Sequence, residues 1–132
     1  MSLHHPERLA QCDIDLVRLM NAVAQTRDIV IVQGARSLEE ERTAIASGHS
    51  ALRNPLDSKH VVDPEHRPLA LAVDAAPLPL DWNDLAALQT LGLAVKAVAA
   101  DLGIPLIWGG DWVHLKDLDH FELVHAHAEP TL

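Results

Sequence analysis

A single acidic residue lies inside a short apolar run near the middle of the chain. Residues 69–75 read Leu-Ala-Leu-Ala-Val-Asp-Ala, which has the length and composition of a buried central strand. A carboxylate in such a strand is costly to bury unless it is paired or binds a metal ion. The alternative is that Asp74 ends the strand in a turn, which the nearby Pro77 and Pro79 favour. If the strand is central, the fold must bring partners to Asp74 from other segments.

The composition limits both the number of domains and the residues that can serve as those partners. The chain has 132 residues, of which 48% are hydrophobic, enough to bury the core of one domain, which we place at residues 1–132. Cys12 is the only cysteine, so no intrachain disulfide can form and a metal site must use His, Asp and Glu. We interpret Cys12 as a buried bystander thiol. The net charge of -9 argues against a nucleic-acid partner.

Helical spacing of apolar residues covers three parts of the chain. The first twenty-five residues predict helix in one or two pieces. Capping-box spacing after Ser37 predicts a second helix that ends near Gly48. A longer helix is predicted to be capped by Asp81 or Asn83 and to end at Gly103.

Short apolar runs between these helices predict strands. The four expected strands are 29–32, 69–75, 106–108 and 121–124. Residues 49–68 have few apolar side chains and no period, so we expect a loop whose length is typical of a functional segment. Residues 126–132 are expected to form a flexible tail. Helices interleaved with strands, without a regular βαβ rhythm, predict an α+β domain.

Two distant segments carry residue types that bind a catalytic metal. Ser58-Lys59-His60 precedes Asp74, and Asp117 lies three positions before His120. A catalytic zinc ion takes about three His or carboxylate ligands and keeps one position for water. The two segments together supply two imidazoles, one carboxylate and a further acid that is able to act on that water.

These segments resemble motifs of the D-alanyl-D-alanine carboxypeptidase-type zinc peptidases. That family includes the vancomycin-resistance D,D-peptidases and the phage endolysins that are L-alanyl-D-glutamate endopeptidases, and the chain looks most similar to the endolysins. Residues 33–37 resemble the family's G-x-R-[ST] turn, and residues 58–60 with 72–74 resemble its S-x-H…A-x-D motif. Residues 108–112 and 117–122 resemble its closing W-G-G-D-W…D-x-x-H-F-E block, which is the most specific of the three.

The resemblance implies a fold, a metal site and roles for individual residues. The implied fold is the Hedgehog and D,D-peptidase type, a single domain with a small antiparallel sheet and flanking helices. The implied cofactor is Zn²⁺, held by His60, Asp74 and His120, with Asp117 as general base. Arg36 matches the family arginine that binds substrate and stabilises the developing oxyanion.

One feature departs from the family pattern. The family sets its first histidine seven residues before its aspartate, with a glycine between them, whereas His60 and Asp74 are fourteen apart and that glycine is absent. We interpret residues 61–68 as a loop inserted beside the site. His66 lies in this loop and is a competing first ligand, but only His60 follows the Ser-x frame.

Structural roles compete with the functional ones at several positions. Arg36 has an alternative role as an ion-pair partner of Glu39 or Glu40. Asp119 competes with Asp117 for the role of base. Glu122 is either a support for a metal ligand or a solvent-facing strand residue. We expect packing roles for Trp108 and Trp112, and exposed positions for His4, His5, His49, His114, His125 and His127.

The resemblance predicts a monomeric peptidase that acts on peptidoglycan stem peptides. Its expected reaction is hydrolysis of the amide bond between L-alanine and D-glutamate. The alternatives are a D,D- or L,D-carboxypeptidase of the same family and a non-catalytic metal-binding or wall-binding module. The chain has no uninterrupted apolar run of about 18 residues and no secretory signal in its first residues. We therefore expect no membrane insertion, synthesis in the cytoplasm, and action on the cell wall after release.

Overall fold

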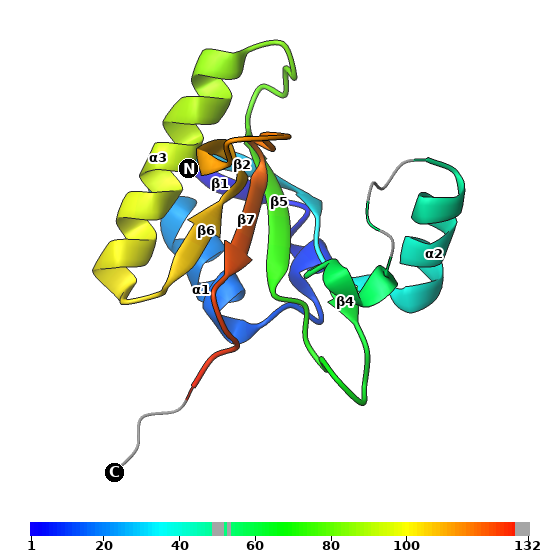
Figure 1. Ribbon diagram of the computed structural model, residues 1–132. Helices are drawn as coiled ribbons and strands as arrows, with labels where there is room; N and C mark the ends of the chain where they lie inside the picture. The colour runs from blue at the N-terminus through cyan, green and yellow to red at the C-terminus, as the bar shows by residue number, and fades with distance from the viewer. Residues whose placement is uncertain (49–51, 53, 129–132) are drawn as a thin grey trace.

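A five-stranded mixed sheet forms the centre of the computed structural model, which describes residues 1–48, 52 and 54–128 (Figure 1). The strand order is β1-β2-β5-β7-β6. The strands are β1 (Ser2–His4), β2 (Asp28–Gln33), β5 (Ala72–Pro77), β7 (His120–Leu123) and β6 (Leu106–Trp108). All neighbours pair antiparallel except β1, which runs parallel to β2. The predicted α+β class is confirmed, whereas the purely antiparallel sheet is wrong at this edge.

Two helices cover one face of the sheet, and a third stands apart from it. Helices α1 (Ile14–Val23) and α3 (Leu85–Leu102) contact each other, and their buried side chains share one core with the sheet (Figure 1). Helix α2 (Leu38–Ala46) lies on the other side of the molecule, beside the 3₁₀ turn η2 (Pro55–Asp57). The sheet therefore has one face filled by helices and one face available for a site.

Side chains alternate between these two faces along the central strands. Val73 and Ala75 of β5, and Phe121 and Leu123 of β7, belong to the core under the helices. Asp74 lies between Val73 and Ala75, so its carboxylate leaves the sheet on the opposite face. The Asp74 side chain is therefore only partly buried. This partial exposure allows an acidic residue inside an apolar strand.

The helix boundaries follow their capping residues. Ser37 and Glu40 form the predicted capping box at the start of α2. The cap of α3 is Asp84, whose side chain accepts from the Ala87 amide, so the predicted cap at Asp81 or Asn83 is wrong. Helix α3 ends as predicted at Gly103, which has a φ of 71°.

The N-terminal twenty-five residues contain more than the predicted helix. The 3₁₀ turn η1 (Pro6–Leu9) and α1 form the two helical pieces, and the sequence prediction missed β1 before them. Cys12 lies between η1 and α1 and is buried, as expected, and burial raises the pKa of its thiol to about 11. Helix α3 is long and apolar enough to cross a membrane by length and composition alone; here it packs against α1, β5 and β6.

The region predicted as a loop over 49–68 also contains regular structure. After η2, the two residues of β4 (Val61–Val62) pair in parallel with β3 (Arg36–Ser37). Residues 49–51 and 53 of the predicted loop, and with them His49, lie outside the described residues. Strands β3 and β4 form a small second sheet, and in Figure 1 β4 lies between β5 and α2.

The C-terminal residues differ from the predicted tail at His127. Its backbone amide donates to the Asp13 carboxylate at 2.9 Å, and its Nδ1 atom lies 2.9 Å from Oδ1 of Asp15. The predicted flexible segment 126–132 therefore begins with anchored residues, and its last four lie outside the described residues. The remaining strands lie within about three residues of their predictions.

Candidate active site

Asp74 and His120 are direct partners on neighbouring strands. They are paired in the antiparallel register of β5 and β7, so their side chains leave the sheet side by side on the site face. The Nδ1 atom of His120 lies 3.1 Å from Oδ1 of Asp74. His120 is buried, and the Asp74 side chain is 18% exposed. The sheet alone thus brings together two of the three predicted metal ligands.

His60 reaches the same carboxylate from the segment that precedes β4. Its Nε2 atom lies 3.3 Å from Oδ1 of Asp74, and its ring centroid is 5.2 Å from that of His120. One ligand atom from each of His60, Asp74 and His120 lies within 4.8 Å of the others. Two imidazoles and one carboxylate that converge in this way match the usual ligands of a catalytic divalent metal ion.

A hydrogen bond behind each ring leaves one nitrogen of that ring facing Asp74. The Nδ1 atom of His60 lies 2.9 Å from the carbonyl oxygen of Gly34, which can only accept, so this nitrogen carries the proton. The Nε2 atom of His120 lies 3.0 Å from Oε1 of Glu122, and the other carboxylate oxygen of Glu122 pairs with Lys59 Nζ at 2.9 Å. Such bonds fix the ring orientation of metal-binding histidines.

The charges of this group stabilise one another. Burial raises the pKa of Asp74, but hydrogen bonds from His120 and His60 outweigh it and lower that pKa to about 2. Burial lowers the pKa of His120, but the bonds to Asp74 and Glu122 outweigh it and raise that pKa to about 9. The site is therefore built around an ionised carboxylate.

Two further acids from one short turn lie next to Asp74. Carboxylate oxygens of Asp74, Asp117 and Asp119 lie within 4.8 Å of one another. Burial raises the pKa of Asp119 to about 8, and its hydrogen bond with Asp117 adds to the rise. Asp119, which the sequence offered only as a competitor of Asp117, is thus a neighbour of both Asp74 and Asp117.

These side chains line a pocket of about 520 Å³ on the site face. Trp112 belongs to its wall, half-buried, with its ring 5.2 Å from that of His120. Trp108 packs in the core, as predicted, and donates from Nε1 to the carbonyl of Leu118. The lining residues are Arg36, Glu41, Leu52, Asp57, Ser58, Lys59, His60, Asp74, Trp112, Asp117, His120 and Glu122.

Arg36 lies in the pocket wall with a partner that the sequence did not predict. Its Nη1 atom lies 2.5 Å from Oε2 of Glu41, whose side chain is fully buried. The predicted partners Glu39 and Glu40 do not form this ion pair. Glu40 closes the capping box of α2, and Glu39 is exposed. Glu41 lies on the inward-facing side of α2. The sequence did not predict its burial, because an acidic residue is not expected in a core.

The competing ligand His66 is not part of this group. Its ring bonds to Asp63, and 64% of its side chain is exposed. Asp63 belongs to the same turn rather than to the metal-binding group. His4, His5, His114 and His125 are exposed, as predicted, whereas His127 is partly buried.

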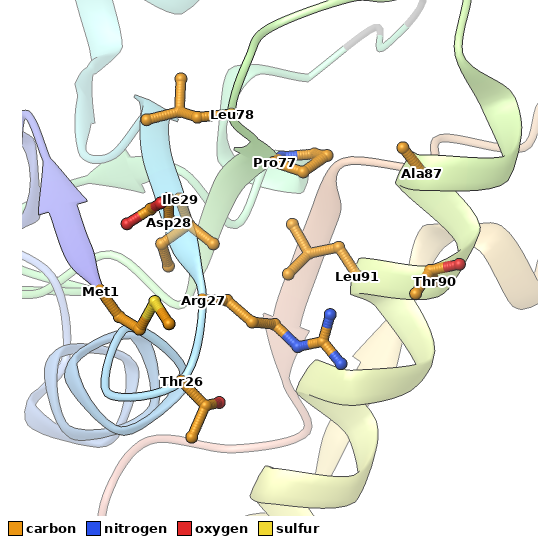
Figure 2. A pocket seen from close by; sticks show the side chains of 10 residues that line it. All are labelled: Met1, Thr26, Arg27, Asp28, Ile29, Pro77, Leu78, Ala87, Thr90 and Leu91. Atoms are coloured by element: carbon orange, nitrogen blue, oxygen red, sulfur yellow. The ribbon is translucent and has the colours of Figure 1, made fainter.

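A second pocket, of about 400 Å³, lies at the other end of the sheet (Figure 2). It opens at the Asp28 end of β2, whereas Asp74 pairs with the Gln33 end. The side chains in Figure 2 are mostly apolar, and the Asp28 carboxylate there accepts from the Ser2 hydroxyl. This pocket contains none of the predicted site residues.

The fold and the site together define a small α+β domain with a His-Asp-His group that could hold a metal ion. A family model described as phage L-alanyl-D-glutamate peptidase matches residues 1–126. The chain therefore belongs to that family.

Two characterised proteins are similar to this chain. The L-alanyl-D-glutamate peptidase of Escherichia phage T5 is 38% identical over 88 residues, which cover 64% of this chain and 59% of the phage protein. The match thus spans less than two thirds of that relative. The crystal structure of the Serratia marcescens L-Ala D-Glu endopeptidase ChiX superposes with a TM-score of 0.74 at 28% identity, over 89% of this chain and 84% of ChiX.

Proposed function

We propose that this chain is a zinc-dependent endopeptidase that hydrolyses the bond between L-alanine and D-glutamate in peptidoglycan stem peptides. The observation that carries the proposal is the convergence of His60, Asp74 and His120 within 4.8 Å, in the wall of a 520 Å³ pocket. The same pocket is also lined by an acid, Asp117, and an arginine, Arg36.

The donor set fits zinc because it combines two imidazole nitrogens with one carboxylate oxygen. The hydrogen bonds from His60 to Gly34 and from His120 to Glu122 leave Nε2 of His60 and Nδ1 of His120 as the donors. A bound zinc ion polarises the scissile carbonyl and lowers the pKa of water.

Asp117 is the proposed general base. It lines the pocket, and its carboxylate lies beside that of Asp74. The neighbouring Asp119 is not among the residues that line the pocket, and burial together with its bond to Asp117 raises its pKa to about 8. Asp117 thus takes the proton from the attacking water and passes it to the leaving amine.

Arg36 is the proposed stabiliser of the charge that develops on the carbonyl oxygen. Its guanidinium lies in the pocket wall, and its bond to the buried Glu41 fixes its orientation. A guanidinium held in this way needs no reorganisation when negative charge appears beside it. The attraction between this guanidinium and the oxyanion therefore arises in the transition state, where it accelerates the reaction.

The proposed substrate is a stem peptide of the cell wall, which the enzyme reaches after release from the cell in which it is made. The test is digestion of defined muropeptides that carry an L-Ala-D-Glu-containing stem, with products identified by mass spectrometry. We expect cleavage between L-alanine and D-glutamate, loss of that cleavage after dialysis against a chelator, and its return when Zn²⁺ is added.

The products separate this proposal from its alternatives. Release of a C-terminal D-alanine alone would assign a carboxypeptidase reaction instead. A protein that binds zinc stoichiometrically but releases no new amino groups from purified peptidoglycan would be a binding module. Cleavage that survives complete removal of the metal would reject the zinc mechanism.

A further inference from the structure

The metal ligand His60 sits on a less supported segment than the other two ligands. Asp74 and His120 lie on central strands, each with a hydrogen-bonded neighbour on both sides. His60 lies instead between the short turn η2 and the two-residue strand β4. Its position therefore depends on whatever holds residues 56–61 in place.

The backbone carbonyls around His60 are held by groups from outside the segment. The carbonyl of Lys59 accepts from the Leu71 amide at 2.8 Å, and that of His60 accepts from the Arg36 amide at 2.7 Å. The carbonyls before and after these two, those of Ser58 and Val61, both accept from one side chain, that of Arg67, and the Ser58 carbonyl also accepts from the Val61 amide at 3.1 Å.

The guanidinium of Arg67 spans the segment. Its Nη1 atom donates to the carbonyl of Ser58 at 2.5 Å and to that of Val61 at 3.5 Å. Its Nη2 atom donates to the carbonyl of Leu56 at 3.2 Å. A planar fork of donors suits several oxygens at fixed positions, which a lysine ammonium on a flexible stem does not match.

The turn that separates His60 from Asp74 delivers this side chain. The amide of Asp63 donates to the carbonyl of Arg67, and the amide of Arg67 donates to the carbonyl of Asp63, each at 2.7 Å. The side chain of Asp63 is buried and bonds to the ring of His66. The extra residues between the two ligands therefore form an ordered turn, and this turn positions the guanidinium of Arg67.

The charge of Arg67 is directed at these carbonyls. Across residues 1–48, 52 and 54–128, no carboxylate forms an ion pair with Arg67. The side chain is also partly buried, so its bonds to the carbonyls are less exposed to competition from water than those of a surface arginine.

We propose that Arg67 is a positioning residue for the metal ligand His60. It acts through the backbone of residues 56–61 and touches neither the metal-binding group nor the substrate pocket. The proposal rests on the proposed role of His60 as a zinc ligand. Loss of the guanidinium lets the His60 segment shift, so the three donors no longer converge.

The test measures zinc affinity by competition with a chromophoric chelator, using the full chain. Arg67→Met keeps an apolar stem and removes the fork, and we expect zinc to bind about 10- to 100-fold more weakly. Arg67→Lys keeps the charge and should restore only part of the affinity. Glu65→Ala changes the same turn at an exposed side chain and should bind zinc as the native chain does.

A double-mutant cycle separates positioning from general destabilisation. If Arg67 acts through His60, Arg67→Met combined with His60→Ala binds zinc no more weakly than His60→Ala alone. Additive losses, or native zinc affinity in Arg67→Met, would overturn the positioning role and leave the proposed function intact. Native zinc affinity in His60→Ala would overturn both, because His60 would then not be a ligand.

Discussion

The Nδ1 atom of His120 lies 3.1 Å from the Oδ1 atom of Asp74, the oxygen that also faces His60. With a pKa raised to about 9, His120 carries a proton in this gap at neutral pH when no metal is bound. A metal ion needs the neutral imidazole, so binding must displace that proton. The geometry therefore makes metal affinity a function of pH.

The first prediction is that zinc affinity rises with pH up to about 9. Below that pH, His120 alone should reduce the apparent affinity by about tenfold per pH unit, because the proton competes with the metal. Calorimetry at pH 7 in buffers of different ionisation enthalpy should detect about one proton released from this site. His66→Ala should release the same number, and binding without proton release would contradict the assignment.

The second prediction concerns the two acids of the turn before β7. Asp117→Asn should lower kcat by about 10²- to 10⁴-fold, because the base is lost, while zinc content stays native. Asp119→Asn keeps the shape of a carboxyl whose pKa is raised to about 8 and which is not among the residues that line the pocket, so its effect on kcat should stay below about tenfold. A larger loss in Asp119→Asn than in Asp117→Asn would exchange their roles.

The third prediction concerns the carboxylate behind His120. Glu122→Ala removes the acceptor of the His120 Nε2 proton and leaves Lys59 without its ion-pair partner. Zinc should then bind about 10- to 100-fold more weakly in a chelator competition assay. Glu122→Gln keeps an acceptor oxygen and should lose less. Glu39→Gln, at an exposed position on α2, is the matched control and should bind zinc normally.

The fourth prediction concerns the close approach of two backbone segments beside His60. A Cβ atom on Gly34 would lie 1.7 Å from the carbonyl oxygen of Arg8, so Gly34→Ala must displace one of them. The free energy of unfolding should fall by about 1–3 kcal/mol, measured by urea titration. Zinc affinity should fall as well, because the Gly34 carbonyl accepts from His60.

Gly48→Ala is the control for that substitution. Among the residues that the structure describes, nothing lies within 4 Å of a Cβ at Gly48, although its φ of +80° makes alanine strained there. It should cost about 1 kcal/mol of stability and leave zinc affinity unchanged. Equal loss of zinc affinity in both variants would mean that the Gly34 carbonyl is not specific to the site.

Local patterns predicted the parts of the fold that local interactions determine. The capping box at Ser37, the end of α3 at Gly103 and the strand around Asp74 all depend on neighbouring residues along the chain. The metal-binding group was predicted from motif resemblance, and spacing alone did not reveal that Asp74 and His120 are register partners. That pairing depends on the strand order of the whole sheet, which no short window contains.

The features that the sequence did not predict are short or held by distant contacts. Strands β1 and β4 have three and two residues, too few to show alternation. Glu41 and Lys59 are charged residues whose roles come from partners brought close only by folding, Arg36 and Glu122. The prediction placed the cap of α3 at Asp81 or Asn83 rather than at Asp84, because these residues offer the same chemistry three positions and one position earlier.

Because Asp74 pairs directly with His120, binding of a cation at this site requires the correct alignment of β5 and β7. Because side chains alternate across a sheet, a slip of one residue between β5 and β7 would turn the carboxylate and the imidazole toward opposite faces. A chain with that error would lose two donors together and could not capture the ion. Under the proposed metal dependence, mass action would then favour the correctly aligned chains over their misaligned competitors.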